Sequence, residues 1–566
     1  ACASTFRPPP MKRRRRPRKA DPVRFENSLG AAVFRLESFA SALAELRGWR
    51  RHAAAFAAGA ISTFALPPYG FLPLLFITVP VLVWLLDGVG EPTRSRRRRV
   101  MWRSAIIGWW FGFGYFLLGL FWIGNAFLVD ADKFAFLLPV AVTLMPAGLA
   151  LFTAAAAALS RLFWFHGYRR IAVFAVVWTA FEWLRGHVLT GFPWAMLGHI
   201  WIDTPAGQAA AWMGALGLSL LSLTLAAAIA QAATTGGHRP VAAAAVALAA
   251  AGLLGGAWGV GTTRLASPGP EARDLRLRLV QPNAAQDLKW DADHSRAFFF
   301  RHLDLTAAPT ADGRAPDLVL WSETAVPFFL ERPGDGLFMA AEAAGGAPLL
   351  MGIQRSEVSR DGGIHFFNSL AVIDPEGAPV AVYDKHHLVP FGEYVPVLGR
   401  FADRPGMGWL GGFASQVLLG YSAGPGPVLL DLGAAGRVLP LICYEAIFSR
   451  NLRGTDRPDW LVQVTNDAWF GERIGPFQHL AQARLRAIEQ GLPLVRAANT
   501  GVSAVIDARG QIVASLGMGR AGTVDADLPG ALSQTPYARI GDWPWHAALA
   551  LVLLGATLLR LRRADH

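Results

Sequence analysis

Apolar residues gather in long uninterrupted runs over the first half of the chain and once more near its C-terminus. The runs cover residues 53–66, 71–86, 104–122, 134–159, 171–184, 208–232, 241–260 and 545–559. A helix needs about 20 apolar residues to cross a hydrocarbon core of about 30 Å. Four of the first seven runs meet or approach that length, whereas the first, second and fifth are short. The pattern predicts a polytopic helical membrane bundle of about eight spans, seven in residues 51–262 and one in residues 543–561.

Basic residues between these runs orient the predicted bundle. They occupy the connections at residues 94–103, 161–170 and 238–239, whereas the connections near Asn125 and Leu189 carry few. Lys and Arg concentrate on the cytoplasmic side of membrane proteins. We therefore expect both termini, including the tail 562–566, to be cytoplasmic, and the segment after the seventh span to be extracytoplasmic.

A different pattern begins near residue 275, where short β-branched runs alternate with helical stretches and Pro/Gly turns. The predicted strands are 275–281, 318–321, 349–353, 369–373, 438–443, 461–465, 494–497 and 502–506. Residues 295–305 and 478–490 have helical periodicity. Such alternation is typical of an α/β domain, which we place at residues 273–530.

Composition agrees with a membrane protein. Hydrophobic residues make up 53% of the 566-residue chain and charged residues only 17%, which differs from soluble globular domains. The net charge of +12 suggests nucleic-acid binding at first, but eight basic residues in 7–19 and six in 94–103 together exceed it. Short basic clusters beside apolar runs fit membrane orientation better, so we expect no nucleic-acid partner.

The N-terminal tail and the cysteines complete this picture. Residues 1–50 are expected to form a basic disordered tail, with an amphipathic surface helix at 27–46. Cys2 and Cys443 are the two cysteines, and a disulfide between a tail and a strand is not expected. Cys-x-x-Cys spacing is absent, and we expect neither a metal nor a cofactor.

Three polar or reactive residues follow apolar strand segments in the α/β region. They are Glu323, Lys385 and Cys443. Strand ends hold reactive side chains rigidly while exposing them to a cleft. Each residue alone has a simpler interpretation, since a free cysteine is commonly buried in a core and a Glu or Lys commonly lies at the surface.

The three segments together resemble the Glu-Lys-Cys triad of the nitrilase superfamily. The contexts are Trp-Ser-Glu-Thr at 321–324, Asp-Lys-His-His-Leu-Val-Pro-Phe-Gly-Glu-Tyr-Val-Pro at 384–396 and Ile-Cys-Tyr-Glu at 442–445. With Thr-Asn-Asp-Ala-Trp-Phe-Gly at 465–471 and the polytopic first half, they are most similar to the apolipoprotein N-acyltransferase branch. Glu472-Arg-Ile-Gly and Ala497-Ala-Asn depart slightly from that pattern, away from the triad. The resemblance implies an αββα sandwich for the α/β region.

The resemblance also implies roles for these residues. A thiol with a pKa near about 8.5 needs a base or a cation to become a nucleophile. Glu323 would accept the proton of Cys443, and Lys385 would stabilise the oxyanion of the tetrahedral intermediate. Glu393, eight residues after the lysine, would support the arrangement.

Four further residues match the family at lower specificity. Trp290 matches an aromatic near the acyl-chain entrance, and Asn368 a residue bordering the site. Tyr444 and Glu445 follow the nucleophile, and we expect Glu445 to orient the site through hydrogen bonds. A packing tryptophan or a turn-forming Asn would account for Trp290 and Asn368 equally well.

The reaction implied by the resemblance is acyl transfer to lipoproteins in the bacterial inner membrane. An acyl chain would pass from a phospholipid, usually phosphatidylethanolamine, to Cys443 as a thioester. The N-terminal amine of an S-diacylglyceryl-cysteine would then receive it. The partners would be these two lipids and the bilayer, with the chain as a monomer.

Two alternatives remain open on the sequence. A membrane-tethered amidase would use the same three residues on a small amide, but one anchoring helix would suffice for it. A lipid-binding or transport protein with an inactive domain would not need an intact Glu323, Lys385 and Cys443.

Overall fold

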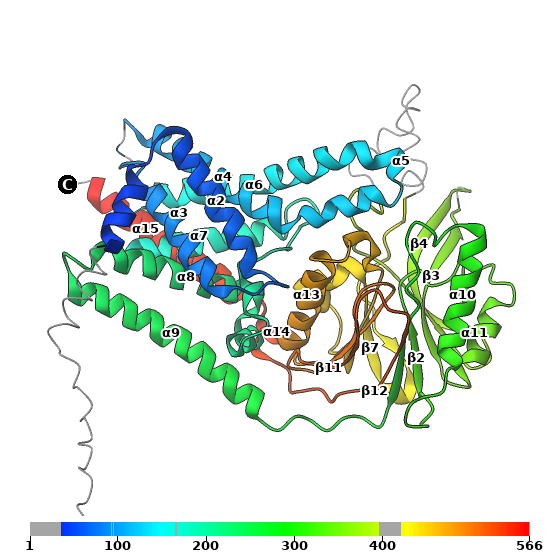
Figure 1. The fold of residues 1–566 in the computed structure, drawn as a ribbon. Coiled ribbons are helices and arrows are strands. Elements are labelled where there is room, and N and C mark those ends of the chain that lie inside the picture. The colour runs from blue at the N-terminus through cyan, green and yellow to red at the C-terminus, as the bar shows by residue number, and fades with distance from the viewer. Residues whose placement is uncertain are drawn as a thin grey trace, which may run out of the picture.

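The protein consists of a helical bundle joined to a two-sheet sandwich (Figure 1). The computed structural model describes residues 35–91, 93, 95–164, 167–360, 362–394 and 420–564. Of the predicted surface helix at 27–46, residues 35–45 are helical. The remainder of that helix and the tail before it lie outside the described residues.

Each predicted apolar run forms a helix. The bundle helices are α2 (Gly48–Ser62), α3 (Leu75–Asp87), α4 (Arg97–Gly119), α6 (Leu138–Leu162), α7 (Arg169–Arg185), α8 (Ala210–Thr235), α9 (Pro240–Ala266) and α15 (Trp543–Ala564). Two short helices, α5 (Ala131–Phe134) and α14 (Pro536–Ile540), lie between them in the chain. Among the described helices, three are long and apolar enough to cross a membrane alone, namely Ala131–Leu162, Pro205–Thr235 and Pro240–Ala266. A fourth candidate pairs α4 with the 3-10 helix Phe121–Leu128 across a 47° bend.

The sandwich contains two six-stranded sheets. The first has the order β12-β1-β2-β3-β4-β5 and the second β11-β10-β9-β8-β7-β6. The strands of the first are β1 (Arg276–Gln281), β2 (Leu318–Trp321), β3 (Leu349–Val358), β4 (Ile364–Ile373), β5 (Pro379–Asp384) and β12 (Gly522–Asp527). Those of the second are β6 (Leu430–Asp431), β7 (Arg437–Ile442), β8 (Trp460–Thr465), β9 (Leu494–Ala498), β10 (Ser503–Ile506) and β11 (Ile512–Leu516). In each sheet, three strands pair in parallel.

Alternation along the strands builds four layers, which confirms the αββα sandwich. Successive side chains of a strand point to opposite faces. Leu318 and Leu320 of β2 therefore pack against the second sheet, whereas Val319 and Trp321 pack under the helices α10 (Ala292–Ala307) and α11 (Gly336–Ala344). On the other side, β7, β8 and β9 pack under α13 (Gly475–Gln490).

Helix α13 also faces the bundle, so the sandwich packs directly against the bundle through this helix (Figure 1). A single hydrophobic cluster contains bundle residues together with Leu485 and Ile488 of α13. Gln478 of α13 accepts hydrogen bonds from the indoles of Trp122 (3.1 Å) and Trp194 (2.7 Å). Other hydrogen bonds join the two parts as well, such as that from the N–H of Ala215 to Glu489 Oε1 at 2.9 Å.

Several elements differ from the sequence prediction. Strand β7 ends at Ile442, one residue earlier than expected, because Cys443 has a backbone conformation that leaves the strand. Strand β4 begins at Ile364, so Asn368 lies within it rather than at its start. Strands β6, β11 and β12 and helix α11 were not predicted as elements, and of β5 only the apolar segment before Lys385 was expected.

Candidate active site

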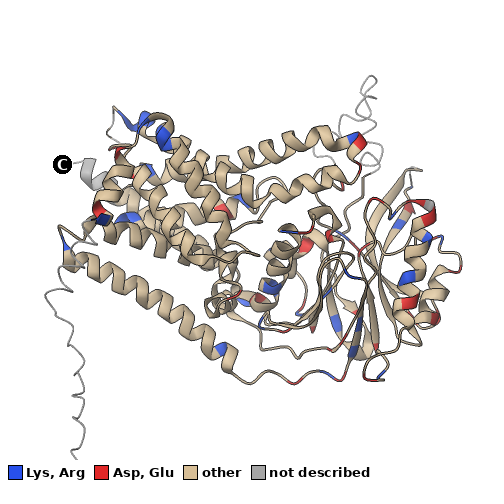
Figure 2. Ribbon diagram, in the orientation of Figure 1, with Lys and Arg blue, Asp and Glu red and all other residues tan. Residues whose placement is uncertain are grey.

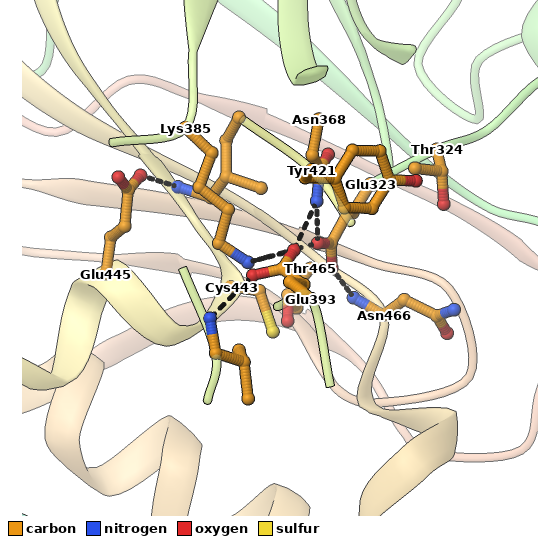
Figure 3. Close-up of polar contacts among 12 residues, drawn as sticks. Glu323, Thr324, Asn368, Lys385, Glu393, Tyr421, Cys443, Glu445, Thr465 and Asn466 are labelled. Carbon is orange, nitrogen blue, oxygen red and sulfur yellow. Dashed lines mark hydrogen bonds and ion pairs between the residues drawn. The ribbon is translucent and has the colours of Figure 1, made fainter. Parts of the chain in front are cut away.

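The three predicted catalytic residues lie together, each just beyond the end of a strand. Glu323 follows β2, Lys385 follows β5 and Cys443 follows β7. Strands β2 and β5 belong to one sheet and β7 to the other, so the two sheets supply the site jointly. Figure 3 shows the three side chains converging with Glu393.

Lys385 is the charged centre of the cluster. Its Nζ lies 2.8 Å from Glu393 Oε1 and 3.6 Å from Glu323 Oε1, and the residue is 1% exposed. Burial alone would lower the pKa of Lys385, but the carboxylates of Glu393 and Glu323 outweigh it and raise that pKa. A buried ammonium flanked in this way keeps its proton and can stabilise a nearby anion.

Glu323 is held by two hydrogen bonds besides its ion pair. Asn368 Nδ2 donates to Oε1 at 2.7 Å and the backbone N–H of Asn466 donates to Oε2 at 2.8 Å. Burial raises the pKa of Glu323, Lys385 opposes that effect and Glu393 adds to it. A carboxylate whose pKa is raised is a better base than an ordinary glutamate.

Cys443 lies in a tight turn at the end of β7. Its φ of 50° is in the left-handed region, which non-glycine residues rarely adopt and which is commonly found at functional sites. Burial and the Glu323 carboxylate raise the pKa of the thiol, and the Lys385 ammonium lowers it less. The resting side chain is therefore a thiol rather than a thiolate, and it needs a base to react.

Glu393 and Asn368 tie the cluster together. Glu393 Oε1 accepts from Lys385 and from Asn368 Nδ2 (3.0 Å), while its Oε2 accepts from the N–H of Val389 at 2.8 Å. Asn368 Nδ2 thus bridges the two carboxylates (Figure 3). Asn368 Oδ1 is buried without a hydrogen-bond partner among the described residues.

Glu445 makes the kind of hydrogen bonds expected of it. Its Oε1 accepts from Tyr383 Oη (2.9 Å) and from the N–H groups of His386 (2.9 Å) and His387 (3.1 Å). Its Oε2 accepts from the N–H of Ile442 at 2.7 Å. Glu445 therefore joins the backbone after Lys385 to the backbone before Cys443.

Tyr444 and Trp290 lie outside this hydrogen-bonded cluster. Tyr444 Oη donates to the carbonyl of Gly191 in the bundle at 3.0 Å, so its hydroxyl contacts the bundle. Trp290 is 48% exposed, and its ring lies 5.5 Å from Lys289 Nζ. A half-exposed aromatic beside a buried site remains free to contact a ligand.

Lys289 and Tyr421 were not predicted. Lys289 Nζ donates to the carbonyl of Glu323 (3.2 Å) and to Thr324 Oγ1 (3.0 Å), and burial lowers its pKa to about 8 although Glu323 opposes the shift. Tyr421 donates its backbone N–H to the carbonyl of Glu393 at 2.9 Å. No local sequence pattern indicates either residue. For Lys289, a lone Lys in a polar loop is usually solvated.

A metal site is not present in the part of the chain that the structure describes, where no three His, Cys, Asp or Glu side chains form a group able to bind one. The site holds instead a thiol, a buried base and a buried cation. This set can carry out nucleophilic acyl transfer, in which a thioester forms and is then attacked by a second nucleophile.

Comparison with known proteins gives matches to both parts of the chain. Residues 58–228 match the model of the apolipoprotein N-acyltransferase N-terminal domain, and residues 276–537 match that of the carbon-nitrogen hydrolases. An apolipoprotein N-acyltransferase of Rhodopseudomonas palustris is 44% identical over 537 residues, or 93% of this chain and 98% of the relative. One of Bradyrhizobium diazoefficiens is 44% identical over 94% of this chain and 99% of the relative. One of Allorhizobium ampelinum is 43% identical over 93% and 99%.

Proposed function

The chain belongs to the apolipoprotein N-acyltransferase family, and from this we propose that it acylates lipoproteins through a thioester on Cys443. The acyl donor is a membrane phospholipid, with phosphatidylethanolamine expected. The acceptor is the N-terminal amine of an S-diacylglyceryl-cysteine. No cofactor takes part, and a monomer suffices because one chain supplies all the groups named below.

In the first half-reaction Glu323 takes the proton from the Cys443 thiol. The sulfur attacks the carbonyl carbon of a phospholipid ester, and the resulting oxyanion is stabilised by the Lys385 ammonium. The C–O bond to the glycerol then breaks, and Glu323 returns the proton to the leaving oxygen. The products are a lysophospholipid and an acyl thioester.

In the second half-reaction the lipoprotein amine attacks the thioester carbonyl. Glu323 accepts a proton from the amine, the C–S bond breaks, and the proton passes to the Cys443 sulfur. The product is an amide, and the enzyme is restored.

The observation that carries this proposal is a buried Glu-Lys-Cys cluster attached directly to an apolar bundle. Cys443 is 5% exposed, Glu323 7% and Lys385 1%, and Tyr444 next to the thiol contacts the bundle. A site of this kind admits lipid while restricting water, which favours aminolysis of the thioester over hydrolysis.

The proposed topology has eight spans, with the bundle at residues 51–262, the sandwich at 273–530 outside the cytoplasm and the last span at 543–561. Basic residues gather at the end of the bundle far from the sandwich (Figure 2). Arg51, Arg161 and Arg170, from three helices, all contact the segment 87–90. The positive-inside rule puts such an end in the cytoplasm, with both termini on that side of a bacterial inner membrane.

A two-substrate assay tests the proposal against an amidase. The purified protein in detergent is given a phospholipid and a diacylated lipopeptide, and the lipopeptide's N-terminus is examined by mass spectrometry. We expect a mass gain of one acyl group that is lost with Cys443→Ala. Hydrolysis of small amides without any acylated lipopeptide would contradict the proposal and favour the amidase.

A further inference from the structure

The carbonyl of Cys443 is held by a buried polar network on the face of β8 that packs against α13. Gln463 Nε2 lies 3.1 Å from this carbonyl oxygen and His479 Nε2 lies 3.0 Å from it. Gln463 and His479 are both 0% exposed. A residue at positive φ persists only where its surroundings hold it in place, so these contacts are candidates for that task.

Arg496 fixes which way the Gln463 amide faces. Its Nη1 lies 2.5 Å from Gln463 Oε1. A guanidinium carries only donors, so the amide oxygen must be the atom that faces it. The amide nitrogen, with its two hydrogens, then faces both the Cys443 carbonyl and His479 Nε2, which lies 3.0 Å away.

His479 supplies the acceptor for the second of those hydrogens. Its Nδ1 lies 2.9 Å from Asp467 Oδ1, and a carboxylate accepts, so Nδ1 carries the proton. Burial, together with the Arg496 cation, lowers the pKa of His479, so the ring is neutral and Nε2 presents a lone pair. The amide nitrogen of Gln463 carries hydrogens whichever nitrogen of His479 is protonated, so its donation to the Cys443 carbonyl at 3.1 Å does not depend on the histidine.

We infer that Gln463 is a positioning residue for acyl transfer, which sets the turn of Cys443 by binding its carbonyl. The inference rests on the proposed role of Cys443 as nucleophile. In a trans peptide the C=O and the following N–H point in opposite directions. By holding the carbonyl, Gln463 therefore also directs the N–H of Tyr444 away from the network.

The network resists rearrangement because its charges are paired deep in the protein. Asp467 lies between Arg496 and His479, and Asp467 and Arg496 are at most 1% exposed. Breaking a buried pair of this kind leaves an uncompensated charge in the protein interior, which is strongly unfavourable. The ring of His479 also packs on Trp194 and Phe470, with centroids 5.5 and 5.6 Å apart, so the network reaches the bundle interface.

Gln463→Glu tests the inference, because the carboxylate can still accept from Arg496 but cannot donate to Cys443. The full chain in detergent is mixed with acyl-labelled phospholipid, and the rate of thioester formation is measured over a range of lipid concentrations. We expect the rate at saturating lipid to fall about 10- to 100-fold, with the half-saturating concentration changed less than about twofold because the lipid contacts are intact.

Gln482→Glu is the matched control. Gln482 is 1% exposed on α13, and its Nε2 donates to the carbonyl of Gln478 at 3.3 Å, away from Cys443. Gln482→Glu places a carboxylate in the same buried region as Gln463→Glu does. Its rate at saturating lipid should stay within about twofold of the wild-type rate. If Gln463→Glu does not fold, Gln463→Met, which fills similar space but cannot donate to the Cys443 carbonyl, carries the same comparison.

The outcomes separate the inference from the proposed function. A wild-type saturated rate in Gln463→Glu, or in Gln463→Met where that stands in, would overturn the inference, as would equal losses in the variant and in Gln482→Glu. Label transfer that persists in Cys443→Ala would instead overturn the proposed function itself.

Discussion

Two residues beside the proposed chemistry have positive φ although neither is glycine. Cys443 has a φ of 50° and Thr324, which follows Glu323, a φ of 46°. Each is held by a buried partner, Gln463 in the first case and Lys289 in the second. The proximity of Glu323, Lys385 and Cys443 could be predicted from their motifs. Their backbone strain and the two partners could not, because those depend on residues distant in the chain.

The ionisation of Glu323 should control the acid limb of the pH profile, in which the rate of thioester formation rises with pH. The base must be ionised, and burial raises its pKa above the ordinary 4.5. The rate should therefore rise with pH through that raised value and fall as pH drops below it. The measurement is the single-turnover rate of acyl transfer to the enzyme from acidic to neutral pH.

Glu393→Gln provides a matched test of the same limb. It removes a negative charge that helps to raise the pKa of Glu323, so the midpoint of the limb should move to lower pH. The plateau should also fall, because Lys385 loses its ion pair at 2.8 Å. A midpoint that stays or moves upward would show that another group controls the limb.

Lys289→Met should slow thioester formation about tenfold by releasing the turn that carries Glu323. The ammonium donates to the Glu323 carbonyl and to Thr324 Oγ1, and methionine fills similar space without donating. Lys133→Met is the control, since Lys133 is 64% exposed in the side chain and pairs only with Asp130 among the described residues. Equal rates in the two variants would contradict the proposed role of Lys289.

Among the elements, those buried on both faces could be predicted and those at the edges could not. The short apolar runs of β2, β7 and β8 are covered by a sheet and a helix, so hydrophobicity alone revealed them. Strand β11 has exposed residues at three of its five positions, and β6 contains two residues. Such strands show little hydrophobic pattern because they are exposed to solvent or pair with only one neighbouring strand.

Gly352 of β3 shows how an element positions the base. A Cβ at this residue would lie 2.3 Å from the carbonyl oxygen of Ser322 and 2.6 Å from the Cα of Glu323. Gly352→Ala should therefore displace Glu323 and lower the acylation rate about 10- to 100-fold. Gly517→Ala, where a Cβ meets nothing within 4 Å, should leave the rate unchanged. An active Gly352→Ala would show that β3 does not set the position of Glu323.

For the whole molecule, the membrane bundle could be predicted from hydropathy, but its contacts with the sandwich could not. Gln478 meets Trp122 and Trp194 across 356 and 284 residues of sequence, and no local pattern indicates that pairing. The eight helices match the eight predicted runs, yet only three are long and apolar enough by themselves among the described residues. The eight-span topology accordingly stays a prediction.

Labelling of single cysteines tests that topology. Both native cysteines are first removed as Cys2→Ser and Cys443→Ala. One variant then carries Glu376→Cys in the exposed β4–β5 turn, and another carries Ser95→Cys in the exposed α3–α4 connection. A membrane-impermeant maleimide added to intact spheroplasts should label the first and not the second, and lysis should expose both. The reverse order of labelling would invert the proposed orientation.

The central claim is that Cys443 carries the acyl group as a thioester. The most direct measurement incubates the purified chain with a phospholipid labelled in its acyl chain, without acceptor, and follows label on the protein. We expect label that hydroxylamine removes and that is absent from Cys443→Ala. Label that resists hydroxylamine, or that persists in Cys443→Ala, would contradict it.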